Sequence, residues 1–382
     1  MDPRVLEAML PCFREKFGNA ASRNHPFGWE AEKLVENARA RLARILHADP
    51  KEIIFTSGAT ESDNLALKGV AEMYREKGNH LITQVTEHKA VLDTARHLEK
   101  HGFRVTCLPV DGYGRVDPEK IQEAVTDKTL LISVMAANNE IGTLQPIEEI
   151  GRIAKAKGVL FHVDAAQAAG KIPLDVEKMG IDLLSFSAHK MHGPKGIGAL
   201  YVRRGNPRVR LAPLIHGGGH EGGMRSGTLD VPAIVGFGKA CEISGEEMGE
   251  EGRRILGLRE RLHRAIAAGL DGVELNGHPE KRLAGNLNFS FSSVEGESLL
   301  MSLSEEIAVS SGSACSSAKA EPSYVLKALG IGEERVHTSI RFGIGRFNTE
   351  EEIDYAARRV IDTVKRLREI FPLHEVSKGG YN

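Results

Sequence analysis

The strongest constraint in this sequence is an alternation of short apolar runs with helical patterns along its first two thirds. Each run is four to seven residues long, and several lack the in-out alternation of a half-exposed strand. Such runs are typical of strands that helices cover on both faces. The alternation predicts an α/β fold around a mostly parallel seven-stranded sheet. The predicted strands are Ile53–Thr56, His80–Gln84, Arg104–Val110, Thr129–Met135, Val159–Asp164, Asp182–Ser187 and Gly198–Val202.

The pattern changes from about Glu246 onward, where long helices with charged faces begin. Apolar residues at helical spacing, from Ile255 to Gly269, line one face of the first of them. Thr349 and Glu352 form a capping box before the last. Single cores stop growing at about 250–300 residues, and the chain has 382. We therefore expect a large α/β domain over 1–245 and a smaller α+β domain over 246–382.

Charge, hydropathy and cysteine spacing exclude several classes of protein. A net charge of -2, without a Lys/Arg cluster, argues against nucleic-acid binding. The apolar stretches are strand-length, and the start lacks the pattern of a signal peptide, so neither a membrane span nor secretion is expected. The four cysteines lie far apart, which argues against disulfides and structural zinc and fits a reducing cytoplasm. Cys12, Cys107 and Cys241 fall within helix or strand patterns and are expected to be packing residues.

Three side chains are expected at strand ends, where open α/β sheets bind ligands. Asp164 ends a strand that should be buried, so it needs a facing cation or a raised pKa. Lys190 follows another strand, beside His189, and could act as an amine nucleophile or base. His88 follows a third strand and could shuttle protons or stack on a ring. Each alone has an ordinary structural alternative, and only their convergence favours catalysis.

Weaker signals come from a turn, a loop and an arginine. Small residues at Ser57–Thr60, between a strand and a helix, could bind an anion, although an ordinary junction capped by Thr60 is the better interpretation. Cys315 lies among small residues that indicate an exposed, mobile loop, where a thiol is a candidate nucleophile. Arg341 could bind a substrate carboxylate. No histidine or cysteine spacing matches a metal site.

Nine blocks of sequence carry a family resemblance over nearly the whole chain. They are FTSGATESDN, TEHKAVLD, NNEIGTLQPI, FHVDAAQA, SFSAHKMHGPKGIGALYVRR, GGGHEGGMRSGT, SSGSACSSA, EPSYVLKALG and SIRFGIGRF. In this order they resemble the cysteine desulfurases, in the class V aminotransferase branch of the fold-type I pyridoxal-phosphate enzymes. Each block alone is weak, but the combination is highly specific.

The resemblance implies a role for each matching residue. Lys190 would carry pyridoxal 5'-phosphate as a Schiff base and move the substrate α-proton, with Asp164 on the pyridine nitrogen. His88 would stack on the ring and handle protons at the substrate thiol. The remaining assignments are Gln167 and Asn139 at the ring oxygen, Asn139 and Arg341 at the substrate carboxylate, and Ala59, Thr60, Ser187 and His189 at the phosphate, joined by Thr228 from the other subunit of a homodimer.

The implied reaction converts L-cysteine to L-alanine and leaves a persulfide on Cys315. The sulfur would pass to an iron–sulfur scaffold protein, with a transient iron–sulfur contact through Cys315, or to another acceptor such as a tRNA-thiolation or molybdopterin pathway. The alternatives are a selenocysteine lyase or another class V lyase with the same cofactor, and a non-catalytic binding module. The family's N-terminal strand and turn and its longer C-terminal tail have no counterpart in the given sequence, so lower activity and weaker partner docking are expected.

Overall fold

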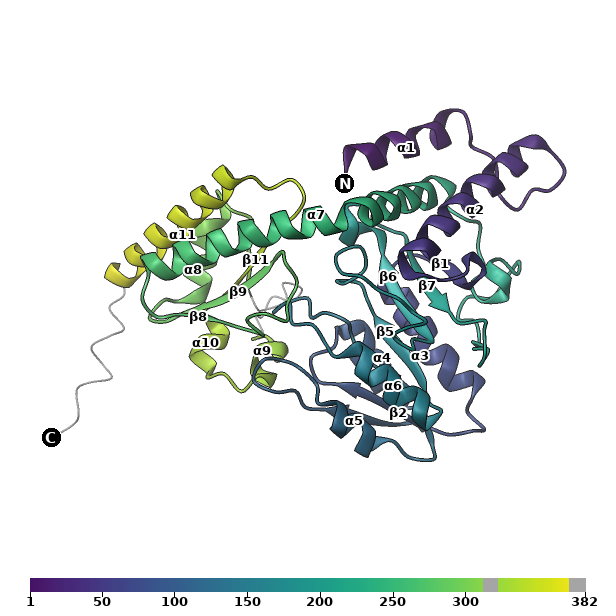
Figure 1. Ribbon diagram of the computed structural model, residues 1–382, viewed down its shortest axis with the longest axis horizontal. Helices are drawn as coiled ribbons and strands as arrows, with labels where there is room; N and C mark the ends of the chain where they lie inside the picture. Colours follow the sequence, from purple (N-terminus) through teal and green to yellow (C-terminus); the bar gives the residue numbers. More distant parts are fainter. Residues whose placement is uncertain (312–321, 371–382) are drawn as a thin grey trace. The chain divides into compact units, whose positions relative to one another are not determined.

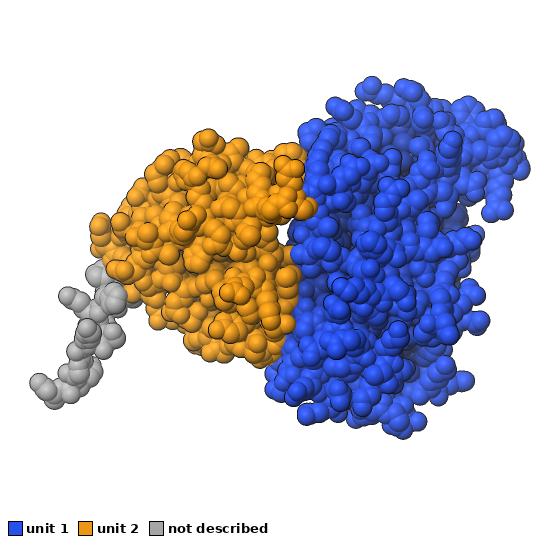
Figure 2. Space-filling model, viewed as in Figure 1, with its two compact units in different colours: residues 1–109, 116–137, 145–248 blue, residues 110–115, 138–144, 249–382 orange. Residues whose placement is uncertain are grey.

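The computed structural model describes residues 1–311 and 322–370, and the chain forms two compact units (Figure 2). The first unit holds residues 1–109, 116–137 and 145–248, and the second holds 110–115, 138–144 and 249–382. Compared with the predicted division after residue 245, the second unit gains the two short segments and loses residues 246–248. The sequence change at Glu246 falls inside one continuous helix, α7 (Val231–Gly269), so it does not coincide with a break in the backbone.

The first unit is built on a seven-stranded sheet of order β1-β7-β6-β5-β4-β2-β3 (Figure 1). Its strands are β1 (Ile53–Thr56), β2 (His80–Gln84), β3 (Arg104–Leu108), β4 (Thr129–Ser133), β5 (Leu160–Asp164), β6 (Leu183–Ser187) and β7 (Gly198–Val202). β7 runs antiparallel to β1 and β6, and the other neighbours are parallel. The predicted mostly parallel seven-stranded sheet is confirmed, and β3 is one of its two edge strands.

Helices cover both faces of this sheet. Ser185 on β6 hydrogen-bonds Asp63 of α3, so it points to the α3 side. Phe186, the next residue, points to the other face, where its ring lies 5.2 Å from that of Phe237 on α7. The helices of this unit besides α7 are α1 (Pro3–Arg14), α2 (Pro26–Leu46), α3 (Ala59–Met73), α4 (Lys89–Glu99), α5 (Pro118–Ala124) and α6 (Ile147–Lys157), with 3-10 turns η1 (Pro50–Glu52), η2 (Ala188–Met191) and η3 (Glu221–Gly223).

Ala66, Val70 and Met73 form an apolar stripe along α3 that is only partly buried. Ala66 and Val70 are fully buried against the sheet, but Met73, the last residue of the helix, is 41% exposed. The stripe therefore packs in the middle of the helix and leaves the core at its C-terminal end. No helix within the described ranges is both long enough and apolar enough to cross a bilayer.

The second unit packs helices on an antiparallel sheet of order β10-β11-β9-β8. Leu258, Leu262 and Ile266, on the predicted face of α7, are buried in its core. The predicted capping box is present, because Thr349 Oγ1 accepts from the Glu352 N–H at 3.3 Å and the Thr349 N–H donates to the Glu352 carboxylate at 3.2 Å. Its elements are β8 (Val273–Leu275), β9 (Asn286–Phe291), α8 (Gly296–Ser304), β10 (Ser310–Ser311), α9 (Tyr324–Ala328), α10 (Glu333–His337), β11 (Ser339–Gly343) and α11 (Glu350–Ile370).

Candidate active site

The turn between β1 and α3 presents backbone N–H groups at the start of a helix. The N-cap of α3 is Gly58, without a side-chain cap, so the expectation that Thr60 caps the helix is wrong. Ala59 and Thr60 occupy the first turn, whose N–H groups have no acceptor within the helix. A Cβ added at Gly198 on β7 would lie 2.6 Å from Gly58 Cα. A glycine is therefore required at 198 for the strand to approach this turn.

Ser187 and His189 lie beside the same turn. The Cα partner of Ser187 across β6 and β7 is Gly198, which also pairs with Thr56 at the end of β1. Ser187 is buried, and its hydroxyl lies 2.8 Å from His189 Nδ1. Burial, reinforced by the charges of nearby lysines, lowers the pKa of His189. A hydroxyl and a neutral imidazole beside a helix N-terminus suit the binding of an anionic group.

His88 and Lys190 act electrostatically on Asp164. Asp164 ends β5, is 4% exposed, and accepts the Ala166 N–H at 2.9 Å. Burial raises the pKa of Asp164, whereas the Ala166 hydrogen bond and the positive charges of His88 and Lys190 oppose that rise. Burial therefore raises the pKa of Asp164, and His88 and Lys190 partly offset the rise. This arrangement favours a cationic ring nitrogen as the ligand of Asp164.

His88 is fixed in orientation although its side chain is exposed. It is the N-cap of α4, and its Nδ1 accepts the Ala90 N–H at 3.1 Å. Because Nδ1 accepts, the proton of the neutral ring lies on Nε2. Nε2 therefore carries the ring's N–H donor, on the side opposite the bond to α4.

Gln167 and Thr228 are placed with less definition. Gln167 is half-buried three residues after Asp164, and its Oε1 accepts from Lys171 Nζ at 3.3 Å. Thr228 is exposed, directly after the glycine-rich loop. Neither placement defines a role at a ring or a phosphate. Their assignments stay predictions.

Two ion pairs that the sequence did not single out hold the glycine-rich loop. Glu221, at a left-handed φ of 51°, is buried and receives two hydrogen bonds of 2.8 Å from Arg39. Arg225 donates to Glu61 at 2.9 Å, and Glu61 in turn accepts the Ser57 N–H at 2.8 Å. The second pair thus connects the loop to the β1–α3 turn. A glutamate among glycines was the only available signal, and its burial, which requires a partner for the charge, appears only in the structure.

Arg341 and Asn139 are brought together in the second unit. Arg341, on β11, donates from Nη1 to the Asn139 carbonyl at 2.7 Å and from Nη2 to Ser310 Oγ at 3.2 Å. Asn139 Oδ1 is buried and has no hydrogen-bond partner among the described residues. The Arg341 guanidinium can donate to a carboxylate. The unpartnered Asn139 Oδ1 is an acceptor, so it suits a donor group and not a carboxylate oxygen.

A layer of buried polar groups next to Asp164 was missed by the sequence reasoning. Asp63 on α3, Glu87 before α4 and His162 on β5 are all at most 1% exposed. Burial raises the pKa of Glu87 to about 8 and raises that of Asp63 well above its ordinary value. Burial also lowers the pKa of His162 to about 3. Polar residues inside otherwise apolar strand and helix patterns were the only signal.

The cysteines divide into three kinds. Cys12 and Cys241 are buried, as predicted for packing residues. Cys107 is exposed, contrary to prediction, because it lies on the edge strand β3. Cys315 lies outside the described residues. Within residues 1–311 and 322–370, no cluster of three or more His, Cys, Asp or Glu is placed to hold a metal.

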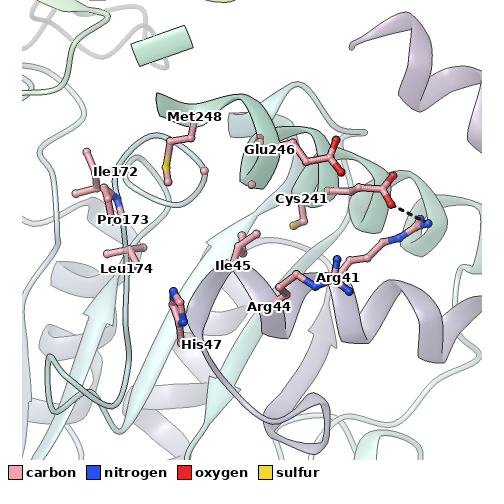
Figure 3. Close-up of a pocket in the computed structure, with 14 residues that line it drawn as sticks. Arg41, Arg44, Ile45, His47, Ile172, Pro173, Leu174, Cys241, Glu246 and Met248 are labelled. Carbon is pink, nitrogen blue, oxygen red and sulfur yellow. Dashed lines mark ion pairs between the residues drawn. The ribbon is translucent and has the colours of Figure 1, made fainter. Parts of the chain in front are cut away.

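The first unit also holds a cavity of about 240 Å³ (Figure 3). It is lined by α2, α7 and the segment 170–174, and none of the predicted site residues that the structure describes contributes to its wall. On its α2 side Arg41 pairs with Glu242 at 3.0 Å. The chemistry predicted from the sequence belongs to the strand ends, not to this cavity.

Comparisons with known proteins agree with the fold and the sequence blocks. The model of the family "Aminotransferase class-V" matches residues 1–356. "Cysteine desulfurase IscS" of Anaeromyxobacter sp. (strain Fw109-5) is 59% identical over 380 residues, covering 100% of this chain and 94% of the relative. A solved "NIFS-LIKE PROTEIN" is 43% identical, with a TM-score of 0.89 over 96% of this chain and 97% of that one. "SspA in complex with cysteine" is 37% identical, with a TM-score of 0.81 over 91% and 97% of the two chains. The chain belongs to the class V aminotransferase family.

Proposed function

We propose that this protein is a cysteine desulfurase that uses pyridoxal 5'-phosphate. The observation that carries the proposal is the convergence of His88 and Lys190 on buried Asp164 at the strand ends. A carboxylate held among cations suits a protonated pyridine nitrogen. Relatives at 57–59% identity over the full chain bear the name cysteine desulfurase, which selects the reaction.

The groups present fit this cofactor. Its phosphate would be held by the N–H groups of Ala59 and Thr60 and by the side chains of Ser187 and His189. Gly198 supports this fit, because any side chain there would collide with the turn. Lys190 would hold the cofactor covalently through its amine. Gln167 and Asn139 would bind the ring oxygen, and Thr228 of a second subunit would complete the phosphate site of a homodimer.

Proton handling is assigned to two side chains. When bound, the cofactor withdraws electrons from the substrate Cα and so acidifies the Cα–H. Lys190 would remove this proton from Cα and return a proton as alanine forms. His88, whose Nε2 faces away from α4, would exchange a proton with the substrate thiol. Asp164 would be ionised beside the ring nitrogen, because His88 and Lys190 oppose the rise in its pKa that burial causes.

Substrate binding and sulfur transfer are assigned to residues of the second unit's sequence. Arg341 and Asn139 would bind the cysteine carboxylate, since Arg341 donates to the Asn139 carbonyl and so lies beside that residue. The Cys315 thiolate would attack the substrate sulfur, the Cβ–S bond would break, and Cβ would take up a proton. One L-cysteine and one thiol thus become one L-alanine and one persulfide.

The persulfide sulfur would then pass to an acceptor. We infer an iron–sulfur scaffold protein as acceptor, through a transient contact at Cys315, in a reducing cytoplasm. The relatives' shared name and the widely spaced cysteines of this chain support that assignment.

The test is cysteine-dependent production of alanine and sulfide by the purified holoenzyme. Lys190→Ala should abolish both products, because no other amine is proposed to move the Cα proton. Lys195→Ala is the matched control, since this exposed lysine lies on the same loop and should leave turnover unchanged. Alanine release by Lys190→Ala at the wild-type rate, or loss of release only in Lys195→Ala, would refute the assignment of Lys190. A wild-type protein that binds no pyridoxal phosphate would refute the function.

A further inference from the structure

A buried chain of hydrogen bonds crosses three strands on the face of the sheet that carries Asp164. His162 on β5 is fully buried, with Nδ1 2.8 Å from Ser133 Oγ on β4 and Nε2 2.9 Å from Ser185 Oγ on β6. Ser185 also hydrogen-bonds Asp63 of α3, and this bond by itself lowers the pKa of Asp63, against the larger effect of burial. Side chains two apart on a strand point to one face, so His162 and Asp164 lie on the same side of β5.

Asp63 has an unusual environment for a carboxyl group. It is 1% exposed, and its Oδ1 lies 3.5 Å from His162 Nε2 but makes no hydrogen bond among the described residues. In the described part of the chain no lysine or arginine forms an ion pair with it. The neighbouring imidazole cannot serve as a cation, because burial lowers the pKa of His162 to about 3. A buried carboxylate without a cation is strongly disfavoured.

Neighbouring carboxyls act in the same direction. The titratable groups that act on Asp63 are Asp164 on β5 and Glu87 after β2, and the negative charge of each would oppose its ionisation. Carboxyls that repel one another do not all ionise, so the negative charge settles where other groups lower the pKa. His88 and Lys190 lower the pKa of Asp164. Burial raises the pKa of Asp63 well above its ordinary value, in agreement with the geometry.

We propose that Asp63 is a positioning residue: as a neutral carboxylic acid it closes the chain Asp63–Ser185–His162–Ser133, which fixes the end of β5 and leaves Asp164 as the anion of the site. The inference rests on the proposed function, because it gives Asp164 a cofactor to hold. In this state the Asp63 O–H donates to Ser185, Ser185 donates to His162 Nε2, and His162 Nδ1–H donates to Ser133. Asp63, Ser185 and His162 then each donate their polar hydrogen to an acceptor.

Asn and Ala at position 63 separate positioning from packing. Asp63→Asn keeps the size of the side chain and an N–H donor to Ser185, so the dissociation constant of pyridoxal phosphate should stay within about twofold of wild type. Asp63→Ala removes the donor and leaves Ser185 and His162 unsatisfied in the core. Cofactor binding should then weaken by about tenfold, the equivalent of about 1.4 kcal/mol. Ser185→Ala breaks the same chain with Asp63 in place and should act in the same direction if Asp63→Ala does not fold.

Infrared difference spectroscopy reads the protonation of Asp63 directly. At neutral pH, wild type minus Asp63→Asn should show the carbonyl-stretch band of a protonated carboxylic acid. Asp182 is the matched control, because this buried carboxyl next to the same sheet pairs with Arg203 at 3.1 Å. Wild type minus Asp182→Asn should show carboxylate bands only.

Three results decide the proposal. An acid band assigned to Asp63, together with rescue of cofactor binding by Asn but not Ala, supports it. Carboxylate bands for Asp63 would overturn it, as would an Asp63→Ala protein with lower thermal stability but unchanged cofactor binding and turnover. Either negative result leaves cofactor binding and alanine release by wild type intact. Failure of this inference is therefore distinguishable from failure of the proposed function.

Discussion

The ion pair between Arg39 and Glu221 gives the sharpest stability prediction. The Glu221 side chain is 2% exposed, and that of Arg39 is 11% exposed. Glu221 accepts two hydrogen bonds of 2.8 Å from Arg39 and one of 2.7 Å from the Phe55 N–H. We expect Glu221→Gln to destabilise the first unit, because it removes the buried counter-ion of Arg39 and leaves only the exposed Glu36 carboxylate.

The magnitude follows from what Arg39 retains. Removing one member of a buried pair costs about 3–5 kcal/mol. Arg39 still donates to the Ile53 carbonyl at 2.8 Å and to Glu36 at 3.0 Å, and its guanidinium lies over the Phe55 ring. The amide oxygen that the substitution introduces can also accept from the Phe55 N–H. We therefore expect the lower end, a loss of about 3 kcal/mol in the free energy of unfolding.

Urea unfolding followed by tryptophan fluorescence measures this loss. The chain has a single tryptophan, Trp29, and it lies on α2, the helix that carries Arg39. The control is Glu72→Gln, since Glu72 pairs with Arg75 at 3.8 Å with both side chains more than half exposed. That variant should lose less than about 1 kcal/mol. A loss of under about 1 kcal/mol in Glu221→Gln would show that the pair does not hold the loop to β1.

The remaining predictions concern the site. The stability of Glu87→Gln relative to wild type should increase as pH rises from about 4.5 to about 8. The folded-state pKa of Glu87 is raised to about 8, so the wild type loses up to about 1.4 kcal/mol of stability per pH unit in that window. Parallel curves of unfolding free energy against pH for the two proteins would contradict this. Gly198→Ala should weaken binding of pyridoxal phosphate by about tenfold or more, since its Cβ would lie 2.6 Å from Gly58 Cα, and equal affinity by fluorescence titration would exclude the contact. Cys315→Ser should bind cysteine but form no persulfide, and mass spectrometry that finds the added sulfur on Cys107 instead would redirect the assignment.

Strand positions were predictable because each apolar run is short and continuous. Four of the predicted strands, such as Arg104–Val110, extend one or two residues beyond an observed end, and the others match. Periodicity measures burial, and burial continues beyond the last ladder hydrogen bond. The antiparallel direction of β7 was not predictable from its composition. A turn and η2 separate it from β6, a connection too short for a parallel crossover, so the direction follows from connection length.

Site residues were predictable where a polar side chain lies at the end of a parallel strand. Asp164 ends β5, and His88 and Lys190 come shortly after β2 and β6. The topology of the sheet brings such positions to one edge. Thr60 was misassigned because a hydroxyl near a helix start resembles a cap, whereas the backbone enters α3 through Gly58. Glu221 and Asp63 were missed because their partners, Arg39 and Ser185, are more than 100 residues away in the chain. Pairings of that kind depend on tertiary structure.

The buried carboxyls explain why Asp164 can sit in the core of a sheet at all. A lone carboxylate there would protonate, since burial alone raises its pKa. The ionised form of Asp164 needs positive charge that acts on it. It also needs neighbouring carboxyl groups that are neutral. Glu87 meets the second condition because burial raises its pKa to about 8 and Asp164 adds to the rise. Asp63 and Glu87 thus support the site by being neutral. Substituting either of them by the amide should weaken cofactor binding less than Asp164→Asn, which removes the negative charge at the strand ends.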